Sequence, residues 1–206
     1  MGLRSNGVKV RAGRVADAVA VRELVEVAFG SEEGRVINSA LSELDARGLS
    51  QTFFVAVDRD GASRGAERVV GVVGLSRAWV DARRRLVDVL VLSPLAVLPE
   101  VQGRGVGAAL LKECVTYGDE VGAPMIVLEG DPRYYGVRGW VEGASRGIER
   151  PSERIPAAAF QVRLLKTHDA WMAGRLVYPD TWWRHDVVGL RDPQLAEIEA
   201  ALGDHS

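Results

Sequence analysis

The spacing of apolar residues near the N-terminus predicts two amphipathic helices after a short first strand. Between residues 17 and 29, Ala20, Leu24 and Val27 recur at three- and four-residue intervals, and similar intervals return between residues 36 and 46. This spacing gathers the apolar side chains on one face of a helix. We therefore expect a helix over each of the two segments.

The next part of the chain has the pattern of antiparallel strands. The segment TFFVAVD is followed by a turn rich in Gly, Arg and Glu at residues 58–68 and then by a β-branched run at residues 69–80. This succession predicts a hairpin. A second apolar run at residues 86–98 follows the charged turn 81–85. We expect its arginines, Arg83, Arg84 and Arg85, at the solvated tip of that hairpin, with a polyanion contact as the alternative.

A single strand–helix–strand unit comes next. We expect a helix over residues 105–120 and an apolar central strand over residues 125–128. Asp131 and Pro132 have the pattern of an N-cap and a first helical residue. The last strand is expected at residues 160–165, and a final helical stretch at 193–202. The sequence has no internal repeat or linker, so we expect one α/β domain of mixed type over residues 1–165, with residues 166–206 as a C-terminal extension packed on it.

Composition and charge narrow the class of protein. The chain has 206 residues, of which 47% are hydrophobic and 26% charged, as is usual for a globular protein with a sizeable core. The formal net charge of -2 argues against a nucleic-acid partner, because phosphate recognition needs a basic face. No apolar segment approaches the roughly 20 residues of a membrane span, and the first ten residues lack a signal core. We expect a soluble cytoplasmic protein, and homodimer formation is left open.

A glycine-rich turn joins the strand at 86–98 to the helix at 105–120 within the string LAVLPEVQGRGVGAALL. Gly103, Gly105 and Gly107 let the main chain approach an anion without interference from Cβ atoms. Successive N–H groups and the positive end of the helix then point into one concavity. Arg104 can add positive charge outside that cradle. An anion site is therefore expected here, with a plain structural turn as the alternative.

The same residues also fit a dinucleotide-binding pattern. Gly103, Gly105 and Ala108 match G-x-G-x-x-A, and Glu129 ends the next strand where a ribose-binding acid would stand. In that fold, however, the first glycine ends the strand directly, whereas residues 99–102 intervene here. One strand–helix–strand unit also does not make a doubly wound sheet. NAD(P) binding is therefore the second choice.

These residues resemble the GNAT superfamily of N-acetyltransferases. Its motif Q/R-x-x-G-x-G/A is matched by Gln102, Gly105 and Gly107. The longer strings LSPLAVLPEVQGRGVGAALL and GAPMIVLEGDPRYYGVRGW are similar to a bacterial branch that carries L-A-V-x-P-x-x-Q-G-x-G-x-G and then G-D-P-x-Y-Y-x-x-x-G-F. Trp140 replaces the usual Phe. The clear resemblance covers residues 93–140, and the expected order of elements extends it over residues 8–165.

The resemblance implies a mixed sheet with helices on both faces, splayed between its fourth and fifth strands to admit the pantetheine arm of acetyl-CoA. Pro94 and Pro99 bracket that opening, and a proline is tolerated where a strand bulges or is left unpaired. The implied cofactor contacts are the backbone of Leu95, Ala96 and Val97 for pantetheine, and Gln102 with Gly103, Arg104, Gly105, Val106, Gly107 and Ala108 for the pyrophosphate. Tyr134 is expected either to pack or to contact the cofactor.

The implied activity is acetyl transfer to a primary amine of a small molecule or peptide, which needs a deprotonated amine, an oxyanion donor and a proton for the departing thiolate. By resemblance, Tyr135 is the general acid and a backbone N–H near Val97 is the oxyanion donor. Glu129 is the first candidate for the base. Glu100 and Asp88 are lesser candidates.

Several further residues bear on the type of reaction, on metal binding and on the acceptor site. Cys114 falls within the expected helix pattern without a visible His partner, so we expect direct transfer and no acyl-enzyme. His168, His185 and His205 lack ligand spacing, and no metal is expected. Tyr178, Trp182 and Trp183 either line an acceptor cleft or pack into the core, and we expect packing. A sensor module that binds an acyl-CoA without catalysis is the alternative to an enzyme.

Overall fold

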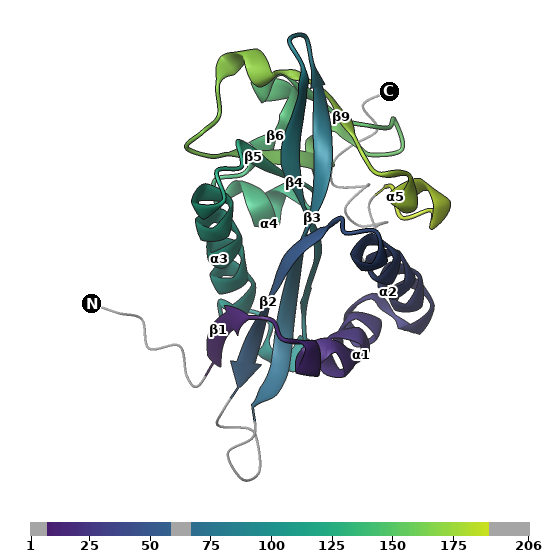
Figure 1. Cartoon of the computed structure of the whole chain (residues 1–206). Coiled ribbons are helices and arrows are strands. Elements are labelled where there is room, and N and C mark those ends of the chain that lie inside the picture. Colours follow the sequence, from purple (N-terminus) through teal and green to yellow (C-terminus); the bar gives the residue numbers. More distant parts are fainter. Residues whose placement is uncertain (1–7, 59–66, 190–206) are drawn as a thin grey trace, which may run out of the picture.

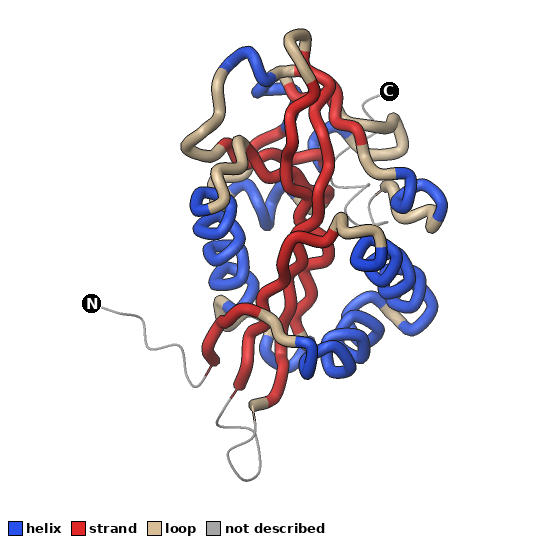
Figure 2. The backbone as a smooth tube through the Cα atoms, viewed as in Figure 1, coloured by secondary structure: helices blue, strands red, loops and turns tan. Residues whose placement is uncertain are grey.

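A mixed β-sheet forms the central layer of the molecule, with helices on both of its faces (Figure 1). The computed structural model describes residues 8–58 and 67–189. Figure 2 shows the strands as one layer between the helices. The helices are α1 (Ala18–Phe29), α2 (Ser31–Ala46), α3 (Val106–Glu120), α4 (Pro132–Gly136) and α5 (Asp180–Arg184). The strands are β1 (Val8–Ala12), β2 (Ser50–Asp58), β3 (Arg68–Ala82), β4 (Leu86–Val97), β5 (Met125–Glu129), β6 (Val141–Glu142), β7 (Ile148–Glu149), β8 (Phe160–Leu164) and β9 (Gly174–Val177). Short 3-10 helices are η1 (Val15–Asp17), η3 (Pro99–Val101), η4 (Gly143–Arg146), η5 (Ala157–Ala159) and η6 (Ala170–Met172).

Strand order follows chain order through the first five strands. β1 to β4 are joined antiparallel, β5 lies parallel to β4, and β8 and β6 complete the order β1-β2-β3-β4-β5-β8-β6. β9 pairs antiparallel with Trp79–Ala82 of β3, beyond the point where β2 begins opposite Ser76. The antiparallel first half of the sheet does not fit the doubly wound parallel sheet that a dinucleotide fold requires.

The sheet splays between β4 and β5. The two strands pair only at Leu90 with Ile126 and at Val91 with Val127. Beyond those pairs β4 runs on to Val97 and β5 to Glu129. The opening lies between the fourth and fifth strands, where the sequence predicts it.

A bulge in β4 lies at the start of this opening. The β3–β4 register shifts between Val73 and Leu75, so that Ser93 and Pro94 stand opposite Gly74. A Cβ atom on Gly74 would lie 2.7 Å from the Ser93 carbonyl oxygen, which explains why the position holds glycine. Pro94 therefore occupies a bulge, as expected for a residue that has no N–H to donate to a ladder.

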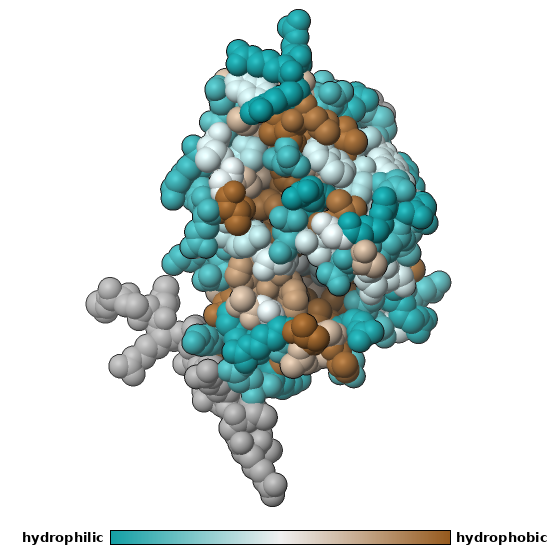
Figure 3. All heavy atoms as spheres, in the orientation of Figure 1, coloured by the Kyte–Doolittle hydropathy of each residue, from teal (hydrophilic) through white to brown (hydrophobic). Residues whose placement is uncertain are grey.

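The two faces of the sheet are covered by different helices (Figure 1). α3 covers one face with Leu110, Leu111 and Cys114 buried, and it lies close to β3, where a Cβ on Gly71 would be 3.1 Å from the Leu110 side chain. α1 and α2 form a close pair on the other face, because Gly34 brings its backbone against that of Glu26. The surface in Figure 3 is mostly hydrophilic, with hydrophobic residues in separate patches.

Several sequence predictions need correction. The second helix begins at Ser31 and not at residue 36. The strand at 160–164 is not the last one, because β9 follows at Gly174–Val177, and β6 and β7 are further short strands. β9 has only four residues, of which Leu176 alone is buried, so it carries little pattern. The helix expected at 193–202 and most of the turn at 58–68 lie outside the described residues.

The tip of the β3–β4 hairpin is exposed, as expected. Two of its arginines also contact an aromatic ring, since the guanidinium carbons of Arg84 and Arg85 lie 5.4 and 5.3 Å from the centroid of Trp171. Such cation–π contacts stabilise a long hairpin against the segment that leads into β9. A polyanion is therefore not needed to explain these arginines.

Candidate active site

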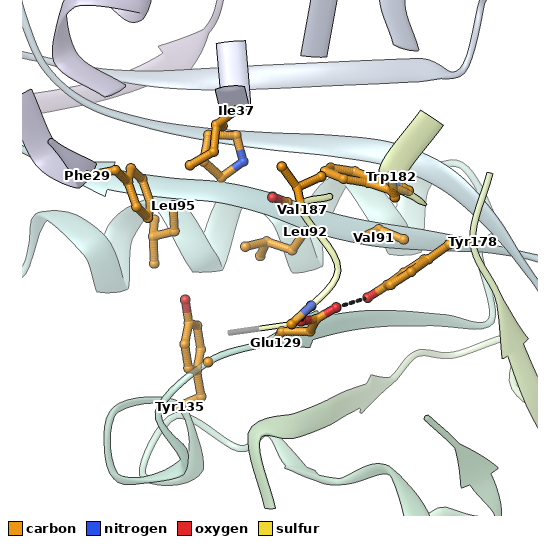
Figure 4. A pocket seen from close by; sticks show the side chains of 14 residues that line it. Phe29, Ile37, Val91, Leu92, Leu95, Glu129, Tyr135, Tyr178, Trp182 and Val187 are labelled. Carbon is orange, nitrogen blue, oxygen red and sulfur yellow. Dashed lines mark hydrogen bonds between the residues drawn. The ribbon is translucent and has the colours of Figure 1, made fainter. Parts of the chain in front are cut away.

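A cavity of about 120 Å³ lies where β4 and β5 separate (Figure 4). It collects side chains from α1, α2, β4, β5, α4 and the segment around α5. Of the residues that sequence reasoning selected, Leu95, Glu129 and Tyr135 line it. The other described lining residues are Phe29, Ile37, Val91, Leu92, Ser93, Pro94, Gly130, Tyr178, Trp182, Val187 and Gly189.

Glu129 ends β5 and is held by two donors from the C-terminal segment. Its Oε1 atom accepts a hydrogen bond of 2.9 Å from the Tyr178 hydroxyl, and its Oε2 atom accepts one of 2.9 Å from the Gly189 backbone N–H. Burial, reinforced by the adjacent Glu129 carboxylate, raises the pKa of Tyr178 well above its usual value. Tyr178 therefore stays protonated and remains a donor. The carboxylate at the floor of the cavity is fixed in place.

Tyr135 reaches the cavity from α4. Asp131 caps this short helix by accepting from the Arg133 backbone N–H at 2.9 Å, and Pro132 is its first residue, as the sequence predicts. The Tyr135 ring is buried and packs edge-on against Trp140, with 6.0 Å between centroids. Gly130 makes room for it, because a Cβ there would lie 2.3 Å from the ring. Figure 4 shows the Tyr135 hydroxyl pointing into the cavity, toward β4.

The glycine-rich turn follows β4 at the same end of the opening. Gly103 and Gly105 have φ angles of 73° and 81°, and a Cβ atom on either would meet nothing within 4 Å. Gly105 is the N-cap of α3. The Gln102 side chain donates a 3.0 Å hydrogen bond to the Val97 carbonyl and thereby ties the turn to the end of β4. The turn thus presents open main chain next to the start of a helix, which is suited to an anion.

Gly107 lies against Tyr134. A Cβ atom there would lie 2.1 Å from the Tyr134 hydroxyl oxygen, so the space beside Gly107 is filled by protein. Burial raises the pKa of Tyr134, and the Arg138 guanidinium, 3.9 Å from the ring centroid, partly opposes that rise. Tyr134 therefore packs α4 onto the first turn of α3. This packing explains the lack of a side chain at Gly107, and the expected contact of its main chain with a phosphate stays a prediction.

The remaining residues of the expected cofactor site are near the turn but differ in exposure. Ala96 and Val106 are buried, Val97 and Ala108 are half-buried, and Arg104 is exposed. Arg104 helps Arg68 to lower the pKa of Glu100, after the larger effect of Glu100's own backbone hydrogen bond. The cavity borders β4 at residues 91–95, and the glycine-rich turn follows the end of this strand at Val97.

The two lesser candidates for a base lie outside the cavity. Glu100 accepts a 2.7 Å hydrogen bond from Arg68 at the surface, and Asp88 is exposed, 3.8 Å from Arg77. Glu129 is therefore the one carboxylate of the three that lines the cavity. The sequence carries no signal for Phe29 or Ile37, which look like ordinary apolar positions of a helix.

Tyr178 and Trp182 are both buried, as expected for packing, and they also line the cavity. Trp183 is instead largely exposed, with the Arg154 guanidinium 5.8 Å from its ring centroid. Cys114 lies in the core of α3, where burial raises the pKa of its thiol to about 12. Its thiol is therefore protonated near neutral pH and lies outside the cavity.

In the part of the chain that the structure describes, no group of three or more His, Cys, Asp and Glu side chains is arranged to hold a metal ion. His185 lies 2.8 Å from Glu43, and His205 falls outside the described residues. None of the helices within residues 8–58 and 67–189 is both long and apolar enough to cross a bilayer.

A second, larger hollow of about 610 Å³ lies beside the cavity, between the α1–α2 pair and strands β2 and β3. The two share Ser93 and Pro94 as a common wall. The larger hollow is lined by charged and polar groups as well as apolar ones, including Arg14, Arg22 and Asp45. Unlike the smaller cavity, it has basic side chains among its described lining residues.

The family model of the acetyltransferase (GNAT) family matches residues 19–136 of the chain. The uncharacterized N-acetyltransferase YjhQ of Escherichia coli K12 is 29% identical over 121 residues, and the match covers 58% of this chain and 62% of that protein. The chain therefore spans less than two thirds of the length of this curated relative.

Two solved structures share the fold. The GNAT family N-acetyltransferase YhbS of Escherichia coli, in complex with CoA, superposes with a TM-score of 0.74 at 24% identity, covering 89% of this chain and 96% of that one. A GNAT family acetyltransferase from Brucella melitensis, in complex with acetyl-CoA, gives a TM-score of 0.62 at 23% identity, covering 86% and 99%.

Proposed function

The chain belongs to the acetyltransferase (GNAT) family, and from this premise we propose that it transfers the acetyl group of acetyl-CoA directly to a primary amine of a small molecule or peptide. The observation that carries the proposal is the cavity at the splay, which places a carboxylate and a tyrosine hydroxyl at the end of the strand opening. The glycine-rich turn lies at the end of β4 that borders this opening.

The unpaired edge of β4 fits the pantetheine arm of acetyl-CoA. Past Val91 no described strand pairs with the edge of β4 that faces β5, so the backbone of Leu95, Ala96 and Val97 can bind pantetheine amides as an added strand would. Bound acetyl-CoA would supply the acetyl group as an activated thioester. The CoA and acetyl-CoA complexes of the two structural relatives support this assignment.

The turn after β4 fits the pyrophosphate. Gly103 and Gly105 leave open space where other residues carry Cβ atoms, and the N–H groups at the start of α3 add a positive end. We assign the anion contacts to the main chain of residues 103–108, with Arg104 as an outer positive charge. Gln102 contributes by fixing the turn to Val97, and Gly107 by accommodating Tyr134.

Two side chains of the cavity are suited to move protons. Glu129 can take a proton from the acceptor ammonium, directly or through a water molecule, which frees the nitrogen lone pair to form a bond with the carbonyl carbon. Tyr135 can donate its proton to the sulfur as the carbon–sulfur bond breaks. A backbone N–H near Val97 is suited to stabilise the negative charge that develops on the carbonyl oxygen. The nitrogen gives up its second proton as the amide forms, and this proton restores Tyr135, so that the products are an amide and a free thiol.

Transfer in a single complex fits the chain better than an acyl-enzyme. An acyl-enzyme would require an activated nucleophile in the cavity. Cys114 is buried in α3, and the raised pKa of its thiol keeps it protonated. Among the described lining residues, Ser93 is the one aliphatic hydroxyl, and it lies in the β4 bulge.

The C-terminal residues belong to the same functional unit in this proposal. β9 extends the sheet beside β3, and Tyr178 and Gly189 hold the carboxylate of Glu129. We therefore regard residues 166–189, the described part of the C-terminal extension, as packed on the acetyltransferase domain.

Thermal stabilisation by acetyl-CoA, CoA and NAD, followed by acetyl-CoA consumption against a panel of primary amines, tests the proposal. We expect stabilisation by acetyl-CoA and CoA, and turnover with at least one amine class. Binding without turnover of any amine would favour a sensor module. Stabilisation by NAD alone would contradict both assignments.

A further inference from the structure

The side of the cavity that faces Glu129 and Tyr135 consists mainly of apolar side chains, and the buried indole N–H of Trp182, which has no hydrogen-bond partner among the described residues, is a polar group on it. Figure 4 shows Ile37, Val187 and Trp182 together across the cavity from the two polar side chains, with Phe29 beside Leu95 at one end. Ile37, Val187 and Trp182 are at most 9% exposed. Because these residues come from α1, α2 and the segment around α5, three separate parts of the chain contribute apolar surface to the same wall.

The polar groups of the cavity are few and lie on the opposite side. Glu129 is the one charged side chain among the described lining residues, and Ser93, Tyr135 and Tyr178 supply hydroxyls. The Tyr178 hydroxyl already donates to Glu129. A polar chain lying along this wall would lose its hydrogen bonds to water and could replace one of them, at the Trp182 indole N–H.

The size of the cavity limits the group that it can hold. A cavity of about 150 Å³ lined by apolar side chains binds benzene in another protein, and this cavity measures about 120 Å³. A flexible chain of about four to six carbons is of comparable size. The wall therefore suits a narrow apolar chain more than a sugar ring or a branched polar body.

We propose that the acceptor carries its primary amine on an unbranched apolar chain of about four to six carbons, which lies against Phe29, Ile37 and Trp182 while the nitrogen faces Glu129. The inference rests on the proposed function, because it names the substrate class of the same site. It makes the larger hollow beyond Ser93 and Pro94 the place for any remaining part of a longer acceptor.

A series of straight-chain primary amines tests the inference. The specificity constant kcat/KM of the full-length protein is measured with acetyl-CoA for ethylamine, propylamine, butylamine, pentylamine, hexylamine and octylamine. Each added methylene is expected to raise kcat/KM by up to about fourfold, the value of burying one CH₂ group. The gain is expected to stop at about six carbons, where the cavity is full.

An isosteric pair separates apolarity from length. In 2-(2-aminoethoxy)ethanol, oxygen replaces two carbons of hexylamine at the same chain length, and the rates are compared per unprotonated amine. We expect hexylamine to be preferred by at least about tenfold, because the wall offers one donor, the Trp182 indole N–H, and cannot pair both oxygens. Equal rates, or a preference for the oxygen-containing amine, would overturn the inference and direct attention to the larger hollow.

A pair of variants on α1 locates the effect. Phe29 is half-buried at the end of α1 and lines the cavity, whereas Val27 is 58% exposed on the same helix and lies outside it. Phe29→Ala is expected to reduce the gain per methylene by at least half, and Val27→Ala to leave it unchanged. An equal gain in both variants and in the native protein would show that the chain binds elsewhere.

A failure of the proposed function is distinguishable from a failure of this inference. Calorimetric titration of the CoA-loaded protein with the same amines reports binding without turnover. If no amine is acetylated but affinity still rises with chain length, the enzymatic proposal fails, and the part of the inference that stands is that the site binds amines on an apolar chain. If amines are acetylated at rates independent of chain length, the inference fails and the enzymatic proposal stands.

Discussion

The Tyr178 hydroxyl lies 2.9 Å from Oε1 of Glu129, although 49 positions separate the two residues in the chain. Tyr178 follows β9, and Glu129 ends β5. β9 pairs with β3 beyond the start of β2 and so brings the C-terminal segment to the floor of the cavity. The carboxylate that we assign as the base is thus oriented by residues that follow β9, the last described strand.

Tyr178→Phe tests whether this contact positions Glu129. The variant keeps the ring and removes one donor to the carboxylate, and a hydrogen bond donated to a carboxylate favours its charged form. We expect kcat to fall with little change in the KM for acetyl-CoA, and the acidic limb of the kcat/KM profile to move to higher pH. An unchanged pH profile with reduced thermal stability would mean that Tyr178 acts only in packing.

Glu129→Gln tests the base itself. Removal of a general base costs roughly 10²–10⁴-fold in rate, so we expect a loss of kcat in that range while acetyl-CoA affinity is retained. Glu100→Gln is the matched control, because Glu100 pairs with Arg68 at the surface and should not affect the rate. Comparable losses in the two variants, measured by acetyl-CoA consumption, would remove Glu129 from this role.

The contact between Gly107 and Tyr134 predicts a rescue. Gly107→Ala would place its Cβ 2.1 Å from the Tyr134 hydroxyl oxygen but 3.4 Å from the Cζ atom of that ring. We expect the single variant to lower the free energy of unfolding by about 1–3 kcal/mol, as overpacking does, and the addition of Tyr134→Phe to restore most of it. Denaturant unfolding of the two single variants and the double variant measures the coupling. Additive effects would contradict the contact.

Local signals explain how much of the site could be predicted. The Asp131–Pro132 helix start is a signal that acts within a few residues, and the structure confirms it. Such short-range signals gave no sign that Tyr134 fills the space that a Cβ atom at Gly107 would take. β9 has four residues and gains its stability from pairing with β3, so no periodic pattern marked it.

The ion pair between Arg11 and Asp17 predicts a pH dependence of stability. Hydrogen bonds from Arg11 lower the pKa of Asp17, with a smaller contribution from the Arg14 backbone N–H. A carboxyl group whose pKa is depressed on folding stabilises the fold above its unfolded pKa of about 3.9, and this stabilisation is lost as the pH falls through the lower folded value. We expect Asp17→Asn to be less stable than the native protein at pH 7.

The difference in unfolding free energy between the native protein and Asp17→Asn should narrow below about pH 4, because protonation of Asp17 removes the same charge that the substitution removes. Denaturant unfolding from pH 7 down to the acid limit of the fold measures it. A difference in unfolding free energy that stays constant with pH would assign the effect of Asp17→Asn to packing.

Tyr135→Phe tests the last step of the proposed reaction. The hydroxyl points into the cavity, and the ring is held by Trp140 and by the absence of a side chain at Gly130. The substitution should therefore remove the proton without moving the ring. A thiol with a pKa of about 8.5 is a fairly good leaving group, so protonation of the sulfur assists the reaction without being indispensable. We expect kcat to fall by about 10²-fold, near the low end for general acid catalysis, with acetyl-CoA affinity nearly unchanged.

Tyr134→Phe is the matched control, because Tyr134 packs against the first turn of α3 and its loss should affect stability more than rate. A large loss of kcat in Tyr134→Phe together with a native rate in Tyr135→Phe would transfer the acid to the neighbouring ring, and native rates in both would mean that water protonates the thiolate.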